Sequence, residues 1–495
     1  MSNKKTLANN FPRCAGVLLH PTSLPGSDSR WDRDVQGVLG ASAYHFIDLL
    51  QNCGARVWQI LPLVPTHSDM SPYMGLSVFA GNPNLISLDL LQNWGWLDGN
   101  IKPDDCDRQQ AMHLARKNLE TRKGQDYQDF QSFTREQAFW LDDYACFMAI
   151  RNEYKHCHWT GWPAPLRDRE ETALSDFKQQ HVATIDDIKM QQFIFYRQWF
   201  ALKKYANQRG VQMFGDMPIF VAHDSAEVWA RPEEFDLNAD GSPIHVAGVP
   251  PDYFSKTGQR WGNPLYRWSQ MKSDDFYWWR QRVANALQLY DLVRIDHFRG
   301  FQAFWQIDAG EEFAINGKWI KAPGMALFKS LAKHFDYLPL VAEDLGVITD
   351  EVLELRDAFN FPGMKILQFA FDGNANNPYL PHNCPINSVV YTGTHDNDTS
   401  LGWYQDLPSH SQTYVESYLG DSGASMPWQL IRAALASTAF LAVIPMQDLM
   451  QLGSGYRMNT PGQKGENWVW RFKWDQIPAG MPERLLNLSK LFGRA

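Results

Sequence analysis

The sequence predicts an α/β fold in which eight parallel strands close into a (β/α)8 barrel with large inserted subdomains. Eight short apolar segments rich in β-branched residues are bounded by Gly, Pro or Asp. Helical patterns fall between several of them, as βα alternation requires. Three acidic residues, Asp296, Glu343 and Asp396, each stand where such a segment turns polar. Because a barrel gathers the carboxyl ends of its strands around one pocket, these three side chains are expected to lie together.

Eight segments are candidate strands because each is a short apolar run with clear boundaries. In chain order they are residues 16–20, 56–64, 211–221, 292–299, 338–345, 364–370, 388–394 and 441–446. The helical patterns are residues 41–53, 276–288, 351–359 and 428–438. Parallel neighbours need a crossover connection, which is usually a helix, so the alternation predicts a parallel sheet.

Two gaps in the alternation are too long for a single connection. Residues 66–194 contain amphipathic stretches such as 135–154, and we expect a mainly helical insertion after the second strand. Residues 222–275 are rich in Pro, Gly, Asp and aromatic residues, which predicts a loop-rich insertion over the barrel mouth. The whole chain, 1–495, is expected to form one barrel unit around a single core.

Composition excludes several classes of protein. With 495 residues and 44% hydrophobic residues, the chain is globular. The net charge of −9, without a run of Lys and Arg, gives no footprint for nucleic acid. The longest apolar stretch, 433–446, is interrupted and too short to span a bilayer, so no membrane partner is expected.

Cysteine usage and the first residues predict a cytoplasmic location. Six cysteines lack paired spacing, and the two lysines near the start are not followed by an apolar segment typical of a signal peptide. His156, Cys157 and His158 resemble metal ligands, but no second pair accompanies them, and we predict no metal site.

Ordered motifs along nearly the whole chain carry a resemblance to a known family. They are HPTSLPG (20–26), LPLVPT (61–66), SPY (71–73), FAGNP (79–83), GDMPIFVAHDSAEVW (215–229), GVPPDYFSKTGQRWGNPLY (248–266), VRIDHFRG (293–300), PLVAEDLG (339–346), YTGTHDND (391–398), RMNTPG (457–462) and NWVWR (467–471). The chain resembles the amylomaltases, the 4-α-glucanotransferases of glycoside hydrolase family 77, which are related to the α-amylase clan. This resemblance implies no separate C-terminal β-domain, no cofactor, a maltooligosaccharide or glucan donor, and a sugar acceptor. The oligomeric state stays open.

The resemblance also implies roles for the three acids. Asp296 matches the nucleophile, Glu343 the general acid/base and Asp396 the acid that stabilises the transition state. Arg294 lies two residues before Asp296, so both side chains share one face of a strand and the guanidinium favours the ionised aspartate. Glu343 must start protonated, and the nearby charge of Asp296 would raise its pKa. The alternative is that each acid is a surface residue or half of an ion pair, the usual fate of a single Asp or Glu.

Further residues are candidates for binding sugar. The positions that match sugar-contacting or supporting residues of the family are Asp216, Asp252, Arg294 and His395. The aromatic residues in loops with Pro and Gly are Tyr73, Tyr253, Phe254 and Trp261, because sugar rings stack their C–H faces on such side chains. For Asp252 the alternative is a turn former, for His395 a structural hydrogen-bonding role, and for the aromatic residues ordinary packing.

The chain departs from the family pattern at two places near the expected sugar groove. Residues 27–37, SDSRWDRDVQG, stand where a glycine-rich segment is usual, and Met74 stands where Gln is common. The leading hypothesis is disproportionation of α-1,4-glucans, and the two departures bear on acceptor preference rather than on the chemistry. The alternatives are an α-glucan hydrolase, which uses the same three acids, and a non-catalytic glucan-binding protein, which the intact set of acids argues against.

Overall fold

Eight parallel strands close into the barrel that the sequence predicts. The computed structural model describes all residues except 1–10, 27–30, 33–35, 252–254, 421–422 and 464. The barrel strands are β1 (Cys14–Leu18), β2 (Val57–Gln59), β3 (Gln212–Met217), β6 (Leu292–Ile295), β9 (Leu340–Ala342), β10 (Gly363–Ile366), β11 (Ser388–Tyr391) and β12 (Leu441–Pro445). They pair in chain order around the closed sheet, with β12 back on β1. The prediction of an α/β barrel is confirmed.

Most of the observed strands are shorter than the apolar segments that predicted them. The segment 56–64, for example, contains β2, and its remaining residues Ile60, Leu61 and Leu63 are buried in the loop that follows. The loop that follows this strand therefore buries apolar side chains, as the strand itself does. Hydrophobicity alone therefore does not mark the strand end.

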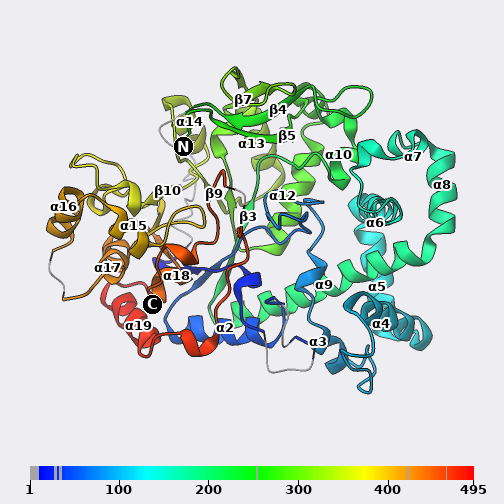
Figure 1. Ribbon diagram of the computed structural model, residues 1–495, viewed down its shortest axis with the longest axis horizontal. Helices are drawn as coiled ribbons and strands as arrows, with labels where there is room; N and C mark the ends of the chain where they lie inside the picture. The colour runs from blue at the N-terminus through cyan, green and yellow to red at the C-terminus, as the bar shows by residue number, and fades with distance from the viewer. Residues whose placement is uncertain (1–10, 27–30, 33–35, 252–254, 421–422, 464) are drawn as a thin grey trace.

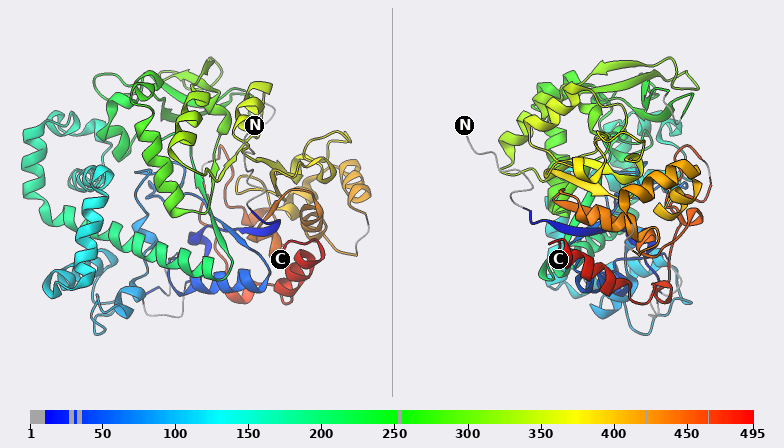
Figure 2. Two further views of the ribbon diagram at one scale, coloured as in Figure 1. Left: turned by 180° about the vertical axis from the view of Figure 1, so that it is seen from behind. Right: turned by 90° about the vertical axis from the view of Figure 1, so that its left-hand side faces the viewer.

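Helices surround the barrel (Figures 1 and 2). The helices that precede or follow barrel strands are α2 (Ala41–Asn52), α12 (Tyr277–Leu289), α13 (Gly324–His334), α14 (Asp350–Ala358), α15 (Ser400–Asp406), α16 (Ser409–Leu419), α17 (Trp428–Ala436), α18 (Met446–Leu449) and α19 (Met481–Leu491). After β12 the described residues form helices and no further strand. Among the described residues no helix is long and apolar enough to cross a membrane.

The connection from β2 to β3 is largely helical and stands on one side of the barrel (Figure 2). Its helices are α3 (Leu88–Asn93), α4 (Arg108–Arg122), α5 (Gln125–Glu136), α6 (Ala138–Glu153), α7 (Ala164–Arg167), α8 (Glu171–Gln180) and α9 (Val182–Gln208). The long α9 runs from this group back to the barrel (Figure 1). Its buried Gln192 exchanges two hydrogen bonds of 2.8 and 2.9 Å with the backbone of Gly81, and Gln198 does the same with Ser87. These amides satisfy loop backbone that would otherwise be buried without partners.

A second, four-stranded sheet has the order β5-β4-β7-β8 and is antiparallel. It consists of β4 (His245–Val249), β5 (Gln259–Pro264), β7 (Ala303–Asp308) and β8 (Lys318–Lys321), which lie along the top of Figure 1. The segment 222–275, expected as loops, therefore contributes two strands, together with α10 (Ala226–Ala230) and α11 (Trp268–Ser273). The Gly and Pro within β5 hid this strand, and a register shift between Val246 and Gly248 accommodates the irregular pairing.

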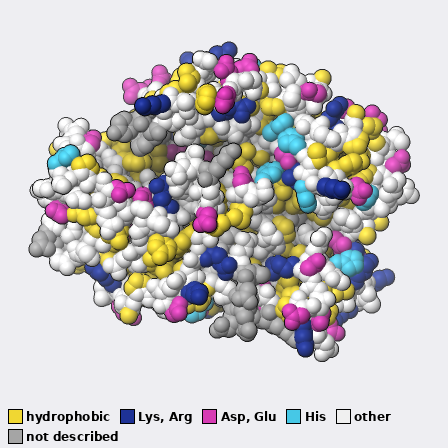
Figure 3. Space-filling view, viewed as in Figure 1, with side chains coloured by type: hydrophobic (Ala, Val, Ile, Leu, Met, Phe, Trp, Pro, Cys, Tyr) yellow, Lys and Arg dark blue, Asp and Glu magenta, His cyan; other side chains and the backbone are white. Residues whose placement is uncertain are grey.

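The face seen in Figure 3 carries Lys and Arg interspersed with Asp and Glu, and hydrophobic side chains are visible in its hollows. Mixed charge of this kind creates no extended field of one sign.

Arg494, close to the C-terminus, lies at the seam of the barrel, where the first strand β1 pairs with the last strand β12. Its buried guanidinium donates to the carbonyls of Cys14 (3.0 Å), Leu435 (2.6 Å), Ser437 (3.0 Å) and Ala439 (2.8 Å). Burial lowers the pKa of Arg494 to about 9. The contacts lie where β1 and β12 begin, at the barrel end opposite to the carboxyl ends of the strands.

We expect Arg494→Met to lower the free energy of unfolding by about 3 kcal/mol, because the carbonyls lose a charged donor and stay buried. Denaturant unfolding measures this loss. Lys490→Met, on the exposed side of α19, should change stability by less than about 0.5 kcal/mol. Equal losses in the two variants would show that the Arg494 hydrogen bonds do not stabilise the seam.

Candidate active site

The three acids emerge at the carboxyl ends of barrel strands. Asp296 directly follows β6, Glu343 directly follows β9, and Asp396 lies in the loop after β11. The neighbouring backbone ties the first two together, because His297 N–H donates to Glu343 Oε2 at 2.7 Å. The structure therefore brings acids that are separated by 47 and 53 positions to one mouth of the barrel.

Arg294 is the buried cation of the site. Its guanidinium donates to Asp296 Oδ1 at 2.8 Å and to Asp216 Oδ2 at 2.6 Å. Burial alone would lower the pKa of Arg294, but the charges of Asp216 and Asp296 outweigh it and raise this pKa well above its usual value. The expectation that Arg294 faces Asp296 along the strand thus agrees with a direct contact. Asp216, at the end of β3, is equally a ligand of the guanidinium.

Glu343 is placed to hold a proton. Burial raises its pKa to about 8, Arg294 acts against this rise, and Asp296 adds to it. The backbone N–H groups of His297 and Leu345 donate to its two oxygens at 2.7 and 3.1 Å, which moderates the rise. His297 has a φ of 52°, a left-handed conformation that turns its amide toward the carboxyl group. Near neutral pH the group is thus mostly protonated and fit to act as a general acid.

Asp396 has the opposite tendency. Its carboxylate is 45% exposed within the concave mouth and contacts His395 Nε2 at 3.3 Å through Oδ2. Asn459 Nδ2 donates to Oδ1 at 2.7 Å. Burial acts to raise the pKa of Asp396, but His395, Asn459 and Arg294 outweigh it and hold this pKa well below its usual value. Asp396 is therefore ionised across the whole neutral range.

Aromatic rings form one wall of the site. Tyr73 stacks on His395 with ring centroids 5.2 Å apart and an interplanar angle of 14°. Trp468 lies beside both rings, at 5.8 and 5.9 Å. The Tyr73 hydroxyl donates to Asp216 Oδ2 at 2.7 Å, and burial together with Asp216 raises its pKa well above the usual value. Tyr73 thus remains a neutral donor to Asp216 Oδ2, the same oxygen that accepts from Arg294.

The other candidate binding residues have different outcomes. Trp261, expected in a loop, stands on β5, and its ring meets the ring of His297 edge-on at 4.8 Å. Asp252, Tyr253 and Phe254 lie outside the described residues.

The two departures from the family pattern have structural partners in their described parts. Met74 Sδ accepts a 3.5 Å hydrogen bond from Asn263 Nδ2. Within 27–37, the backbone N–H groups of Trp31 and Asp32 donate to Asp89 at 3.2 Å. Ser87 Oγ donates to buried Asp32 at 2.5 Å. This part of the segment is thus anchored on the start of α3.

Sequence reasoning assigned no role to the loop that contains Asn459 and Trp468, although it singled out RMNTPG and NWVWR as motifs. Nothing local to these residues points to Asp396, which lies 63 positions earlier. The contact arises because the chain returns to the mouth after β12.

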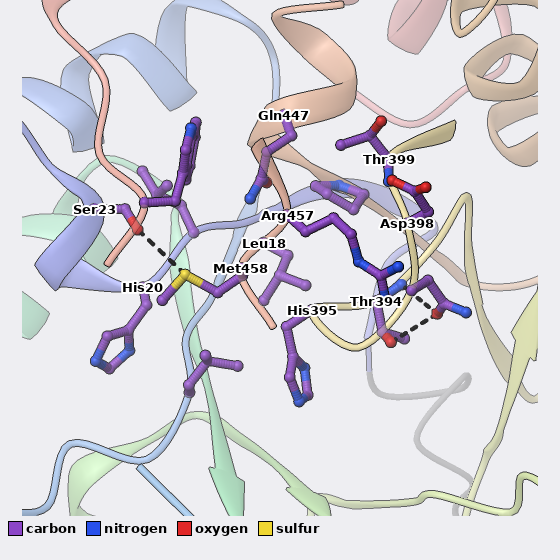
Figure 4. A pocket seen from close by; sticks show the side chains of 15 residues that line it. Leu18, His20, Ser23, Thr394, His395, Asp398, Thr399, Gln447, Arg457 and Met458 are labelled. Carbon is purple, nitrogen blue, oxygen red and sulfur yellow. Dashed lines mark hydrogen bonds between the residues drawn. The ribbon is translucent and has the colours of Figure 1, made fainter. Parts of the chain in front are cut away.

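His395 also lines a pocket of about 440 Å³, a volume that includes its opening to solvent (Figure 4). Figure 4 shows His20, Met458 and Arg457 around it, and Ser23 Oγ donates to Met458 Sδ at 3.7 Å. Burial and the neighbouring His395 lower the pKa of His20 to about 3, so its ring is neutral. None of the three acids lines this pocket.

The side chains of His156, Cys157 and His158 do not converge on one point where a metal ion could bind. His156 and Cys157 are exposed, whereas His158 Nδ1 accepts a hydrogen bond from the backbone of Thr160 at 3.2 Å. Across the part of the chain that the structure describes, no three His, Cys, Asp or Glu side chains are grouped to hold a metal ion.

A buried protonated glutamate, an aspartate bound to a buried arginine and a third, ionised aspartate at one barrel mouth define an enzyme that acts on glycosidic bonds. Comparison with known proteins identifies the family. A family model described as 4-alpha-glucanotransferase matches residues 19–476. The chain therefore belongs to the 4-alpha-glucanotransferase family.

Individual relatives match over almost the full length. The 4-alpha-glucanotransferase of Thermus thermophilus is 47% identical over 480 residues, covering 93% of this chain and 95% of that protein. The chloroplastic/amyloplastic 4-alpha-glucanotransferase of Arabidopsis thaliana is 44% identical over 501 residues, covering 97% of this chain and 86% of that one. The amylomaltase from Streptococcus agalactiae, solved in complex with acarbose, is 36% identical with a TM-score of 0.91, covering 98% of this chain and 100% of that one.

The pKa of Glu343 predicts the basic limb of the pH profile. A general acid works only while protonated, so kcat/KM for maltotriose should fall as pH rises through about 8. With α-glucosyl fluoride as donor, kcat/KM should fall less steeply in this pH range, because fluoride leaves with little protonation. Initial rates between pH 5 and 10, roughly the range in which such groups titrate, test this. The same limb with both donors would assign the titration to another group.

Proposed function

We propose that this 4-alpha-glucanotransferase moves α-1,4-glucan segments from a maltooligosaccharide or glucan donor to the 4-hydroxyl of a sugar acceptor by two displacements. The observation that carries the mechanism is the pair of unlike carboxyl groups, Asp296 bound to Arg294 and Glu343 with its pKa raised to about 8. A retaining enzyme needs one ionised and one protonated carboxyl group on either side of the scissile bond.

In the first displacement Asp296 attacks the anomeric carbon while Glu343 gives its proton to the departing glycosidic oxygen. The donor fragment leaves with a free 4-hydroxyl, and the glucanosyl unit stays bound to Asp296 as an ester. In the second displacement Glu343, now ionised, takes the proton of the acceptor hydroxyl as that oxygen attacks the same carbon. Two inversions give net retention, and Asp296 returns to its carboxylate form.

Asp396 would stabilise the positive charge that develops on the sugar ring in both transition states, since it stays ionised and accessible in the mouth. Tyr73, His395 and Trp261 supply the aromatic and polar surface on which the sugar rests. Asp216 acts through Arg294. Roles for Asp252, Tyr253 and Phe254 in binding the donor remain predictions, and so does a cytoplasmic location.

Transfer is distinguished from hydrolysis by what intercepts the covalent intermediate. Family membership supports transfer, and the second sheet and the helical connection leave the barrel at the carboxyl ends of β2, β3 and β6, where they would limit the access of water.

We expect Asp296→Asn to fold but to lose nearly all turnover, because an amide cannot form the covalent intermediate. Activity with maltotriose should fall by more than about a hundredfold, which corresponds to roughly 3 kcal/mol of barrier. Asp104→Asn, exposed in the connection between β2 and β3, is the control and should be unchanged. A variant that keeps more than about a hundredth of wild-type activity would argue against Asp296 as the nucleophile.

The products from maltotriose test the transferase reaction itself. Transfer exchanges one α-1,4 bond for another, so glucose and a ladder of longer maltooligosaccharides should appear with almost no gain in reducing ends. Chromatography of the products and a reducing-end assay measure both quantities. Glucose and maltose with steadily rising reducing ends would instead establish a hydrolase.

A further inference from the structure

Asp396 differs from the other two acids in how the fold holds it. Asp296 and Glu343 directly follow barrel strands, so paired backbone fixes the start of each side chain. Asp396 lies five residues beyond the end of β11, in a loop, and its side chain is 45% exposed. A short side chain in such a place has several open rotamers. Its orientation must come from contacts with other parts of the chain.

Residues 457–468, here named the return loop, supply these contacts after the chain has passed through β12. Asn459 Nδ2 donates to Asp396 Oδ1 at 2.7 Å, and Asn459 N–H donates to the carbonyl of His395 at 3.2 Å. Arg457 donates to the Asp396 carbonyl at 2.9 Å and to the Asn459 carbonyl at 3.2 Å. The return loop therefore donates hydrogen bonds to the backbone around Asp396 and to the Asp396 carboxylate.

The return loop is itself held in shape. Asn467 Oδ1 accepts from Thr460 N–H at 2.9 Å, and its Nδ2 donates to the Gln463 carbonyl at 2.9 Å. Trp468 N–H donates to the Met458 carbonyl at 2.8 Å. Asn467 thus closes the return loop without touching Asp396, whereas Asn459 is the member whose side chain reaches the carboxylate.

We infer that Asn459 is a positioning residue, which orients the Asp396 carboxylate toward the donor sugar and couples it to the return loop. The inference rests on the proposed role of Asp396. One oxygen is held by Asn459 and the other by His395, so rotation about the side chain would break a hydrogen bond on either side. The amide is neutral and leaves the full negative charge available for the transition state.

Two substitutions separate orientation from simple loop support. Asn459→Ala removes the donor, whereas Asn459→Asp keeps the shape but places a second carboxyl group against the first. The groups that face Asp396 are His395, Arg294 and Tyr73, with Arg457 at its backbone. None of them would change. Two adjacent carboxyl groups do not both ionise freely, so the pKa of the pair rises.

The experiment measures kcat, KM and the pH dependence of kcat/KM for maltotriose in the full-length protein. We expect Asn459→Ala to lower kcat on the order of 10²-fold with little change in KM, as a small misplacement of a catalytic group does. Asn459→Asp should move the acid limb of kcat/KM upward relative to the wild type, because a second carboxyl group against Asp396 disfavours its ionised form. Thermal unfolding checks that both variants are folded.

Asn467→Ala is the matched control, since it loosens the same loop without contacting Asp396. Its loss of kcat should be smaller, and its acid limb should stay in place. Equal losses in Asn459→Ala and Asn467→Ala, with no shift of the acid limb in Asn459→Asp, would overturn the inference. If Asn459→Ala does not fold, the acid limb of Asn459→Asp decides alone. A wild-type protein that hydrolyses maltotriose would refute transfer but leave this inference intact, because the first displacement is common to both reactions.

Discussion

The site depends on a buried guanidinium shared by two carboxylates. Arg294 and Asp216 are direct partners in the parallel pairing of β6 with β3, so their side chains meet on the same face of adjacent strands. Asp296 follows two residues later on that face and takes the second side of the guanidinium. A slip of one residue between these strands would send Arg294 to the outer face and leave the acids unpaired. The register of the barrel therefore also positions Asp296, the proposed nucleophile, and removal of Arg294 would leave two carboxylates without the cation that they share.

The same pocket holds one carboxyl group protonated and another ionised because their immediate neighbours differ. Burial is the largest influence on the pKa of Glu343, and among the described residues no Lys or Arg forms an ion pair with it. Asp396 touches His395 and Asn459, and these contacts overcome burial. The position of each carboxyl group relative to its neighbours therefore decides which group is protonated. The proposed division of roles, with Glu343 as acid/base and Asp396 as electrostatic stabiliser, therefore follows from packing rather than from residue type.

Sequence patterns predicted the parts of the fold that have local causes. Apolar runs ending in polar residues located all eight barrel strands and three acids, and the spacing of two between Arg294 and Asp296 indicated their shared face. The strands β4 and β5 escaped because Gly and Pro interrupt β5 and its pairing is irregular. The limit of 194 for the helical insertion falls inside α9, since one continuous amphipathic helix serves both the insertion and the barrel. Asn459 and Trp468 could not be assigned, because their contacts depend on the return of the chain after β12.

The candidate site is assembled from distant parts of the chain, and this has a consequence for folding. Tyr73 comes from the loop after β2, His395 from the loop after β11 and Trp468 from the return loop, yet the three rings lie side by side. The contacts of Trp468 also need the chain to pass through β12 and return to the mouth. Contacts between residues so far apart in sequence form late, after the entropy of closing the intervening chain has been overcome. The complete arrangement of acids and rings therefore needs the chain after β12, which supplies Asn459 and Trp468.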